Sequence, residues 1–154
     1  MSADQAVLGE VLAAEHAAVY GYGAIAAALS GTSRTVALQG LNVHRERRDQ
    51  LRRMILDGGG KPVEAQAAYE LPRPLGGAGA VVDLAAGIER DVALAFGALV
   101  VAADGDDRGF AALALQDAAV REATWRQEAP RFPGLEDPGL PPEAPTPSAT
   151  ATAN

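Results

Sequence analysis

Four titratable side chains fall on the apolar stripes of predicted helices in this chain of 154 residues. They are three glutamates and one histidine: Glu15, His44, Glu89 and Glu122. Burying a carboxylate is unfavourable unless it is paired, protonated or bound to a metal ion, so each one needs a polar partner inside the protein. Carboxylates and an imidazole on facing helices are also the ligands from which metal sites in bundle cores are built. The four residues therefore predict either a site for iron or manganese or a buried network of ion pairs.

Four helices must position these side chains. We expect Thr32 or Ser33 to cap the second helix and Asp106 or Asp107 to cap the fourth. Hydrophobic residues make up 48% of the chain and aromatic residues 5%, so Ala, Leu and Val must build the core. No alternating strand pattern is present, and the predicted fold class is all-α. Apolar residues recur at the three- and four-residue steps of an amphipathic helix within residues 4–29, 33–57, 80–103 and 107–128.

The connections between the helices predict the topology of a bundle. Short breaks near Gly31 and Gly105 predict two antiparallel hairpins. Residues 59–79 contain prolines that exclude a continuous helix but allow one helical turn at 64–68. About 20 residues of extended chain at about 3 Å each can run the length of a bundle, so we expect a crossover that leaves the second and third helices parallel. The four titratable residues then share the middle third of the bundle, because each lies 13 to 17 residues from a hairpin turn.

The ligand pattern of a ferritin-like di-iron site is incomplete in this sequence. That pattern takes a Glu from each of two helices and Glu-x-x-His from each of the other two. Neither His44 nor Glu122 fits it, since Arg47 and Trp125 stand three residues after them. His16 follows Glu15 directly and therefore lies about 100° around the first helix from it. We expect His16 to point away from the predicted site. A metal site here would be a single ion held by three carboxylates and one imidazole.

Cationic and hydroxyl groups are available for the ion-pair alternative. The helical stripe predicts Arg48 on the buried seam, with Arg121 and the hydroxyl of Tyr20 or Tyr22 as further partners for the carboxylates. A guanidinium on the seam competes electrostatically with a metal cation. On this interpretation, replacing Arg48 with Met destabilises the protein by about 3–5 kcal/mol, whereas Glu15→Gln costs little.

Composition excludes several other classes of function. The net charge of −7 and a pI near 4.7 argue against binding to nucleic acid. The chain has no cysteine, so it has neither disulfides nor thiolate metal ligands. Asp4 stands where a signal peptide needs basic residues, and no apolar run approaches the ~18 residues of a membrane span. We expect a cytoplasmic protein that contacts neither nucleic acid nor membrane.

The folded part of the chain is predicted to end near residue 135. Residues 1–135 form the expected four-helix bundle, with Phe132 and Leu135 packing on its end. Residues 136–154 are rich in Pro, Ala and Thr and lack the apolar content to fold alone, so we expect a disordered tail.

Four stretches of the sequence resemble the ferritin-like family called domain of unknown function 4439. They are residues 14–23 (AEHAAVYGYG), 44–51 (HRERRDQL), 69–72 (YELP) and 132–135 (FPGL). The resemblance implies a ferritin-like four-helix bundle with a long crossover, and it implies no established activity. The wider ferritin-like superfamily binds iron or manganese, but the positions that would carry those ligands depart from the pattern here.

These observations support two hypotheses about function. The first is a non-catalytic helical bundle with a buried carboxylate, His and Arg layer, which acts through self-association as a dimer or through a protein partner. The alternative is a metal-dependent oxidase or oxygenase that binds iron or manganese through Glu15, His44, Glu89 and Glu122. A small-molecule pocket lined by the same residues is a third possibility.

Overall fold

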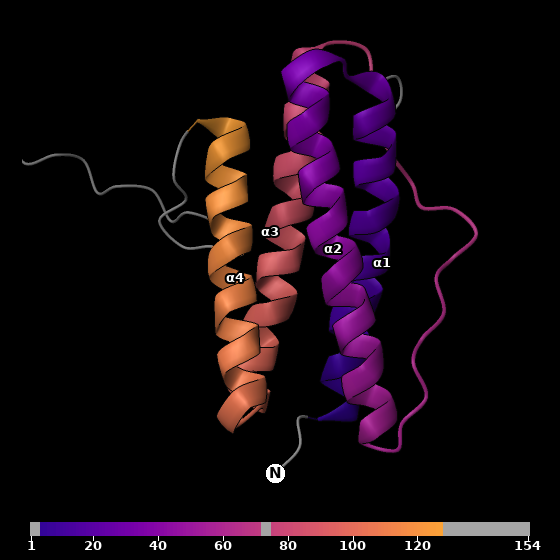
Figure 1. Cartoon of the computed structure of the whole chain (residues 1–154), viewed down its shortest axis with the longest axis vertical. Coiled ribbons are helices and arrows are strands. Elements are labelled where there is room, and N and C mark those ends of the chain that lie inside the picture. The colour runs from indigo at the N-terminus through magenta and orange to yellow at the C-terminus, as the bar shows by residue number, and fades with distance from the viewer. Residues whose placement is uncertain (1–3, 72–74, 128–154) are drawn as a thin grey trace, which may run out of the picture.

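The computed structural model describes residues 4–71 and 75–127, and these form four helices and no strand. The helices are α1 (Gln5–Ala28), α2 (Gly31–Asp57), α3 (Ala78–Ala102) and α4 (Gly105–Arg126). Figure 1 shows α1 antiparallel to α2 and α3 antiparallel to α4, with α2 and α3 running in the same direction. The predicted all-α four-helix bundle with two hairpins and a crossover is confirmed. None of the described helices is long and apolar enough to cross a membrane.

The two hairpin turns are shorter than the sequence predicted. Helix α2 begins at Gly31 with Ser30 as its N-cap, and α4 begins at Gly105 with Asp104 as its N-cap. Both glycines have positive φ, 57° and 54°, a conformation that other residues adopt only with strain. Each turn has only two residues between its helices, so the helices begin earlier than expected. The predicted caps at Thr32 or Ser33 and at Asp106 or Asp107 are therefore wrong.

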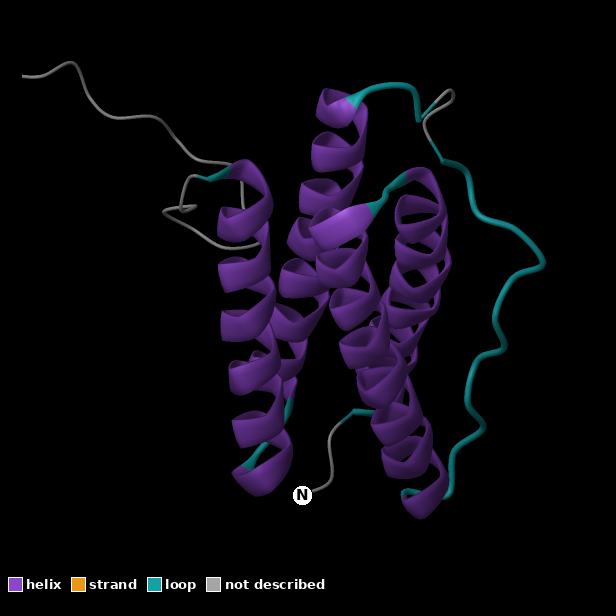
Figure 2. Cartoon of the chain, turned by 45° about the horizontal axis from the view of Figure 1, so that its top comes forward, coloured by secondary structure: helices purple, strands orange, loops and turns teal. Residues whose placement is uncertain are grey.

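The crossover between α2 and α3 runs along the outside of α1 (Figures 1 and 2). Nε2 of His16 lies 3.2 Å from the carbonyl oxygen of Val63, which ties α1 to this segment. The helical turn predicted at 64–68 does not form. Instead, the amide of Gln66 donates a hydrogen bond to the hydroxyl of Tyr69 over 3.1 Å. The predicted packing of Phe132 and Leu135 and the predicted tail at 136–154 lie outside the described residues.

Three of the four possible neighbouring helix pairs pack closely. Helix α1 packs against α2 and α3, and α3 packs against α4. No Cα atom of α2 comes within 8 Å of a Cα atom of α4, whereas packed helices have their axes 8–10 Å apart. Figures 1 and 2 both show α4 beside α3 and apart from α2. The bundle is therefore open along its α2–α4 side.

Two apolar clusters occupy the interior, and a layer of charged side chains lies between them. One cluster includes Leu12, Leu51 and Phe96, and the other includes Ile25 and Leu41. The fully buried charged or titratable side chains between them are Glu15, His44, Glu89 and Glu122. The predicted position of these four residues at one level of the bundle is confirmed.

Gly40 of α2 allows the ring of Tyr22 to reach this layer. A Cβ at position 40 would stand 2.4 Å from Tyr22 Cε1, whereas one at Gly21 would meet only the flexible end of Ile88. Overpacking of a core costs about 1–3 kcal/mol, while Gly→Ala in a helix gains up to about 1 kcal/mol. We expect Gly40→Ala to lower the free energy of unfolding in urea by about 1–3 kcal/mol. Gly21→Ala should change this free energy by less than about 1 kcal/mol. Equal effects would show that Tyr22 is not held against Gly40.

Candidate functional site

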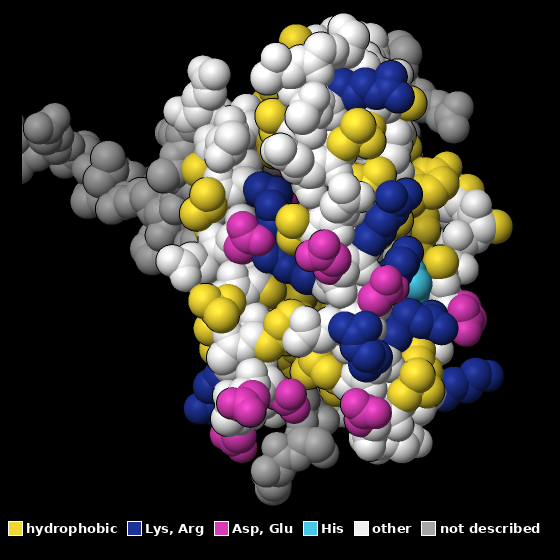
Figure 3. All heavy atoms as spheres, viewed as in Figure 1, with side chains coloured by type: hydrophobic (Ala, Val, Ile, Leu, Met, Phe, Trp, Pro, Cys, Tyr) yellow, Lys and Arg dark blue, Asp and Glu magenta, His cyan; other side chains and the backbone are white. Residues whose placement is uncertain are grey.

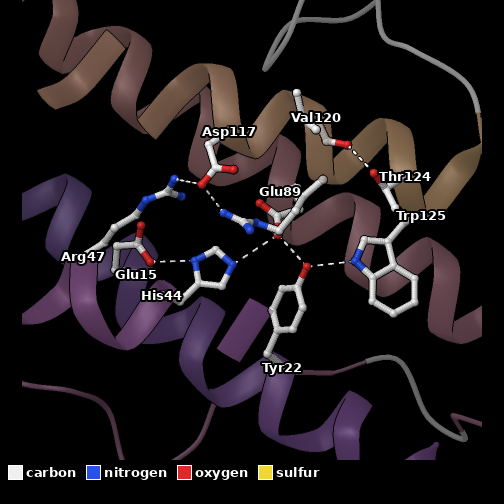
Figure 4. Close-up of polar contacts among 10 residues, drawn as sticks. Glu15, Tyr22, His44, Arg47, Glu89, Asp117, Val120, Thr124 and Trp125 are labelled. Carbon is white, nitrogen blue, oxygen red and sulfur yellow. Dashed lines mark hydrogen bonds and ion pairs between the residues drawn. The ribbon is translucent and has the colours of Figure 1, made fainter. Parts of the chain in front are cut away.

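His44 of α2 lies at the centre of the charged layer, between carboxylates from two other helices (Figure 4). Its Nδ1 is 2.8 Å from Oε2 of Glu15 on α1, and its Nε2 is 3.2 Å from Oε1 of Glu89 on α3. All three side chains are fully buried. Because an ionised carboxylate only accepts hydrogen bonds, both ring nitrogens must carry a proton to donate, which makes the ring a cation. One imidazolium therefore links three helices.

The pKa of His44 follows from two opposing effects. Burial lowers it, because the charged ring loses its hydration. The hydrogen bonds to Glu15 and Glu89 and their negative charges outweigh burial and raise the pKa of His44 to about 9. The ring is consequently a cation at neutral pH.

Glu89 connects the imidazolium to an aromatic pair. Tyr22 donates its hydroxyl hydrogen to Oε1 of Glu89 over 2.5 Å, and Trp125 Nε1 donates to the Tyr22 hydroxyl over 2.9 Å (Figure 4). Burial, followed by the charge and hydrogen bond of Glu89, raises the pKa of Tyr22 far above its usual range. The phenol therefore stays protonated, and the predicted role of Tyr22 as a partner for a buried carboxylate is confirmed.

A set of arginines supplies positive charge to the rest of the layer. Nε of Arg121 lies 3.2 Å from Oε1 of Glu89, as the sequence predicted for this arginine. Glu122 does not join His44. Its Oε1 instead accepts from Nη2 of Arg90 at 2.9 Å and lies 3.4 Å from Nε of Arg126. The four predicted residues therefore form a three-residue cluster and a separate carboxylate–arginine group.

Arg48 does not lie in this layer, and the prediction that it does is wrong. Its side chain is 28% exposed and pairs with the neighbouring Asp49 at 2.8 Å. Arg47, 100° around the helix, is the buried arginine. It contacts Asp117 of α4 and lies over the ring of Phe96, 5.7 Å from its centroid.

Asp117 also contacts Arg121, so it joins the two arginines (Figure 4). Since Arg121 contacts Glu89 as well, the chain of charged contacts runs without a break from α1 through α2 and α3 to α4.

Comparison with known proteins places the chain in a family. The model of the family described as domain of unknown function (DUF4439) matches residues 7–137. The chain belongs to this family. Its fold is similar to the crystal structure of a conserved hypothetical protein, Rv2844, from Mycobacterium tuberculosis, with a TM-score of 0.73 and 38% sequence identity. The match covers 79% of this chain and 93% of that protein. A comparison with curated proteins finds no match.

The described side chains of this DUF4439 member are not arranged to hold a metal ion. Glu15 Oε1, Glu89 Oε2 and Glu122 Oε2 are buried oxygens without a hydrogen-bond partner in the described part of the chain, and such oxygens are suitable metal ligands. They do not converge, however, since residues 4–71 and 75–127 contain no group of three or more His, Asp or Glu side chains placed to hold one ion. Both nitrogens of His44 also face carboxylates.

Several members of the layer were not predicted from the sequence. Arg90 and Arg126 bind Glu122, and Asp117 binds Arg47. Arg126 and Asp117 carry a local signal, because Arg126 stands four residues after Glu122 and Asp117 stands four residues before Arg121 on the same helix. Arg90 carries none. His16 points away from the layer toward the crossover, as predicted.

Proposed function

We propose that this DUF4439 protein is a non-catalytic helical scaffold that acts through self-association as a homodimer. The observation that carries the proposal is the position of His44, whose two ring nitrogens both lie against carboxylates. Neither nitrogen has a position left for a metal ion, and the remaining carboxylate, Glu122, lies against the guanidinium group of Arg90. The layer thus supplies charge-paired contacts that join the helices.

The outer face of α3 supports self-association. Leu94, Ala98 and Val101 recur at steps of four and three and are exposed, Val101 at 82% and Leu94 at 53%. Apolar residues at this spacing form the seam of paired helices, and a small residue between larger ones permits close approach. A second copy of the chain is the partner that we propose for this face.

Sedimentation analysis of the purified full chain tests self-association. We expect a dimer for the natural sequence and a monomer for the variant that carries Leu94→Lys and Val101→Lys, because lysine charges are unfavourable in an apolar seam. Leu56→Lys is the matched control, since Leu56 is 56% exposed but lies on α2. A natural sequence that stays monomeric at high concentration would contradict the proposal.

Metal content separates the scaffold from the oxidase or oxygenase hypothesis. We expect protein purified from cells supplemented with iron and manganese to contain substoichiometric metal, and the amount to be the same in the Glu89→Ala variant. Stoichiometric iron or manganese that is lost in this variant would favour the enzyme hypothesis with Glu15, His44, Glu89 and Glu122 as ligands.

A further inference from the structure

A trough lies between α1, α3 and the second half of the crossover. Its volume is about 410 Å³, within the range of roughly 300–1,000 Å³ that small-molecule sites occupy. Apolar side chains from all three elements line it, namely Ala17 of α1, Leu71 of the crossover, and Leu84 and Ile88 of α3. The trough is therefore large enough and apolar enough to hold a small organic molecule.

Gly87 lines the trough near the middle of α3. Glycine within a helix is less favourable than alanine, because it loses more backbone freedom on folding. In the described part of the chain, a Cβ at position 87 would have no heavy atom of a neighbouring element within 4 Å, so close packing does not account for this glycine. At Gly21, by contrast, a Cβ would stand 2.4 Å from Cδ1 of Ile88. Gly87 therefore leaves open space in the trough without any gain in packing.

Two carboxylates stand on either side of this glycine along the helix. Asp83 precedes Gly87 by four residues and Asp91 follows it by four, so the three positions share one side of α3. Eight residues of helix place the two aspartates about 12 Å apart along the helix axis. Glu70 supplies a third carboxylate from the crossover. The open space over the glycine is therefore bounded by negative charge at both ends.

The negative charge of the trough has little compensation nearby. No lysine or arginine is among its described lining residues. Glu70 and Asp91 form no ion pair within residues 4–71 and 75–127, and Asp83 lies 3.9 Å from Arg126. Burial also raises the pKa of Asp91 above its ordinary value, and the charge of Arg90 opposes this effect only in part. On the face shown in Figure 3, by contrast, basic side chains lie beside acidic ones. A cationic ligand would supply the missing charge in the trough.

Tyr69 adds an aromatic wall to the trough. Its hydroxyl accepts the hydrogen bond from the amide of Gln66, and its ring centroid lies 5.4 Å from that of Tyr20 on α1. These contacts hold the ring from two sides. Because the face of an aromatic ring attracts ammonium groups, this side chain also favours a cation.

These features together describe one class of ligand. It is narrow enough to lie in the open space over Gly87, apolar along its middle and positively charged at both ends. Two ammonium groups joined by eight methylenes are about 11 Å apart in a zigzag of bonds of about 1.5 Å, so such a chain spans the two aspartates. A single metal ion could not meet both carboxylates, and it would leave the apolar lining in contact with water.

We propose that this trough binds a linear aliphatic polyamine. The ligand lies along α3 over Gly87, with its methylenes against the apolar side chains of that helix and its terminal ammonium groups beside Asp83 and Asp91. Glu70 pairs with an internal ammonium group where the ligand carries one. The trough lies on the N-terminal half of α3, whereas the face proposed for self-association spans residues 94–101. Polyamine binding is therefore independent of the proposed dimer.

Isothermal titration calorimetry of the full chain with 1,8-diaminooctane tests this site. The first comparison compound is 1,4-diaminobutane, which carries the same charge but is too short to reach both aspartates. The second is 1,8-octanediol, which has the same length and no charge. We expect 1,8-diaminooctane to bind at least about tenfold more tightly than either, because only this compound meets both carboxylates and the apolar lining between them. Equal affinities for the two diamines, or no binding of the longer one, would overturn the proposal.

Matched variants separate the trough from the general negative charge of the protein. Asp83→Asn combined with Asp91→Asn should weaken the binding of 1,8-diaminooctane by about tenfold. Asp106→Asn combined with Asp107→Asn removes the same charge from α4 and should change the affinity by less than about twofold. Gly87→Leu alters no charge but fills the trough, and it should also weaken binding by about tenfold. Equal weakening by the two asparagine pairs would overturn the proposal, as would natural affinity in a folded Gly87→Leu protein.

Discussion

Replacing Glu89 with alanine is expected to lower the free energy of unfolding by about 3–5 kcal/mol. One oxygen of Glu89 accepts the hydroxyl hydrogen of Tyr22 and lies 3.2 Å from both His44 and Arg121. Removing the carboxylate leaves an imidazolium, a guanidinium and a phenol in the interior without their partner. The loss of a partner from a buried ion pair is among the largest effects of a single substitution, because the remaining charge stays desolvated.

Urea unfolding of matched variants measures this effect. Arg48→Met is the control, because the structure places Arg48 at the surface beside Asp49, where an ion pair contributes at most about 1 kcal/mol. Glu89→Gln should fall between the two, since its amide oxygen can still accept from Tyr22 while the negative charge is lost. If Arg48→Met destabilised the protein as much as Glu89→Ala, Arg48 and not Arg47 would belong to the buried layer.

Stability is expected to fall as the pH rises from about 6.5 to about 9, with His44 as the source. The folded-state pKa of His44 is about 9, against 6.5 for an unperturbed histidine. Between these two pH values the folded state holds one more proton than the unfolded chain. The contribution of His44 to the free energy of unfolding is therefore fully present below pH 6.5 and is lost as the pH rises to about 9. The difference corresponds to about 3 kcal/mol.

The comparison of the natural chain with His44→Gln isolates this contribution. Both proteins would be unfolded in urea near pH 6 and near pH 9. The upper pH stays below the pKa of about 10 that tyrosine has in an unfolded chain, so tyrosine ionisation does not contribute. We expect the natural chain to lose about 3 kcal/mol more than the variant over this range. A parallel decline in both proteins would assign the pH dependence to other groups.

Helical periodicity was sufficient to predict the helices and the level of the charged layer. Glu15, His44, Glu89 and Glu122 each interrupt an apolar stripe at the right distance from a turn, and all four are fully buried. The same periodicity could not choose between Arg47 and Arg48. Steps of three and four residues both keep a side chain near one face, so the choice depends on the position of the facing helix.

The contacts within the layer depend on packing between helices that are distant in sequence. Trp125 and Tyr22 are 103 residues apart, and Arg90 and Glu122 are 32 residues apart. Whether their polar atoms meet is decided by the rotation of each helix about its axis, which no local pattern specifies. The open α2–α4 side was hidden from sequence analysis for the same reason.

The protonation state of the His44 ring tests the central claim most directly, since that claim requires an imidazolium held between two carboxylates. Nitrogen NMR spectra of the side chains resolve this state, and the chain has only two histidines, so His16 is an internal reference. We expect both ring nitrogens of His44 to remain protonated at neutral pH and to titrate near pH 9, unaffected by stoichiometric Mn²⁺. A neutral ring with one bare nitrogen, or a His44 signal broadened by stoichiometric Mn²⁺, would contradict the account.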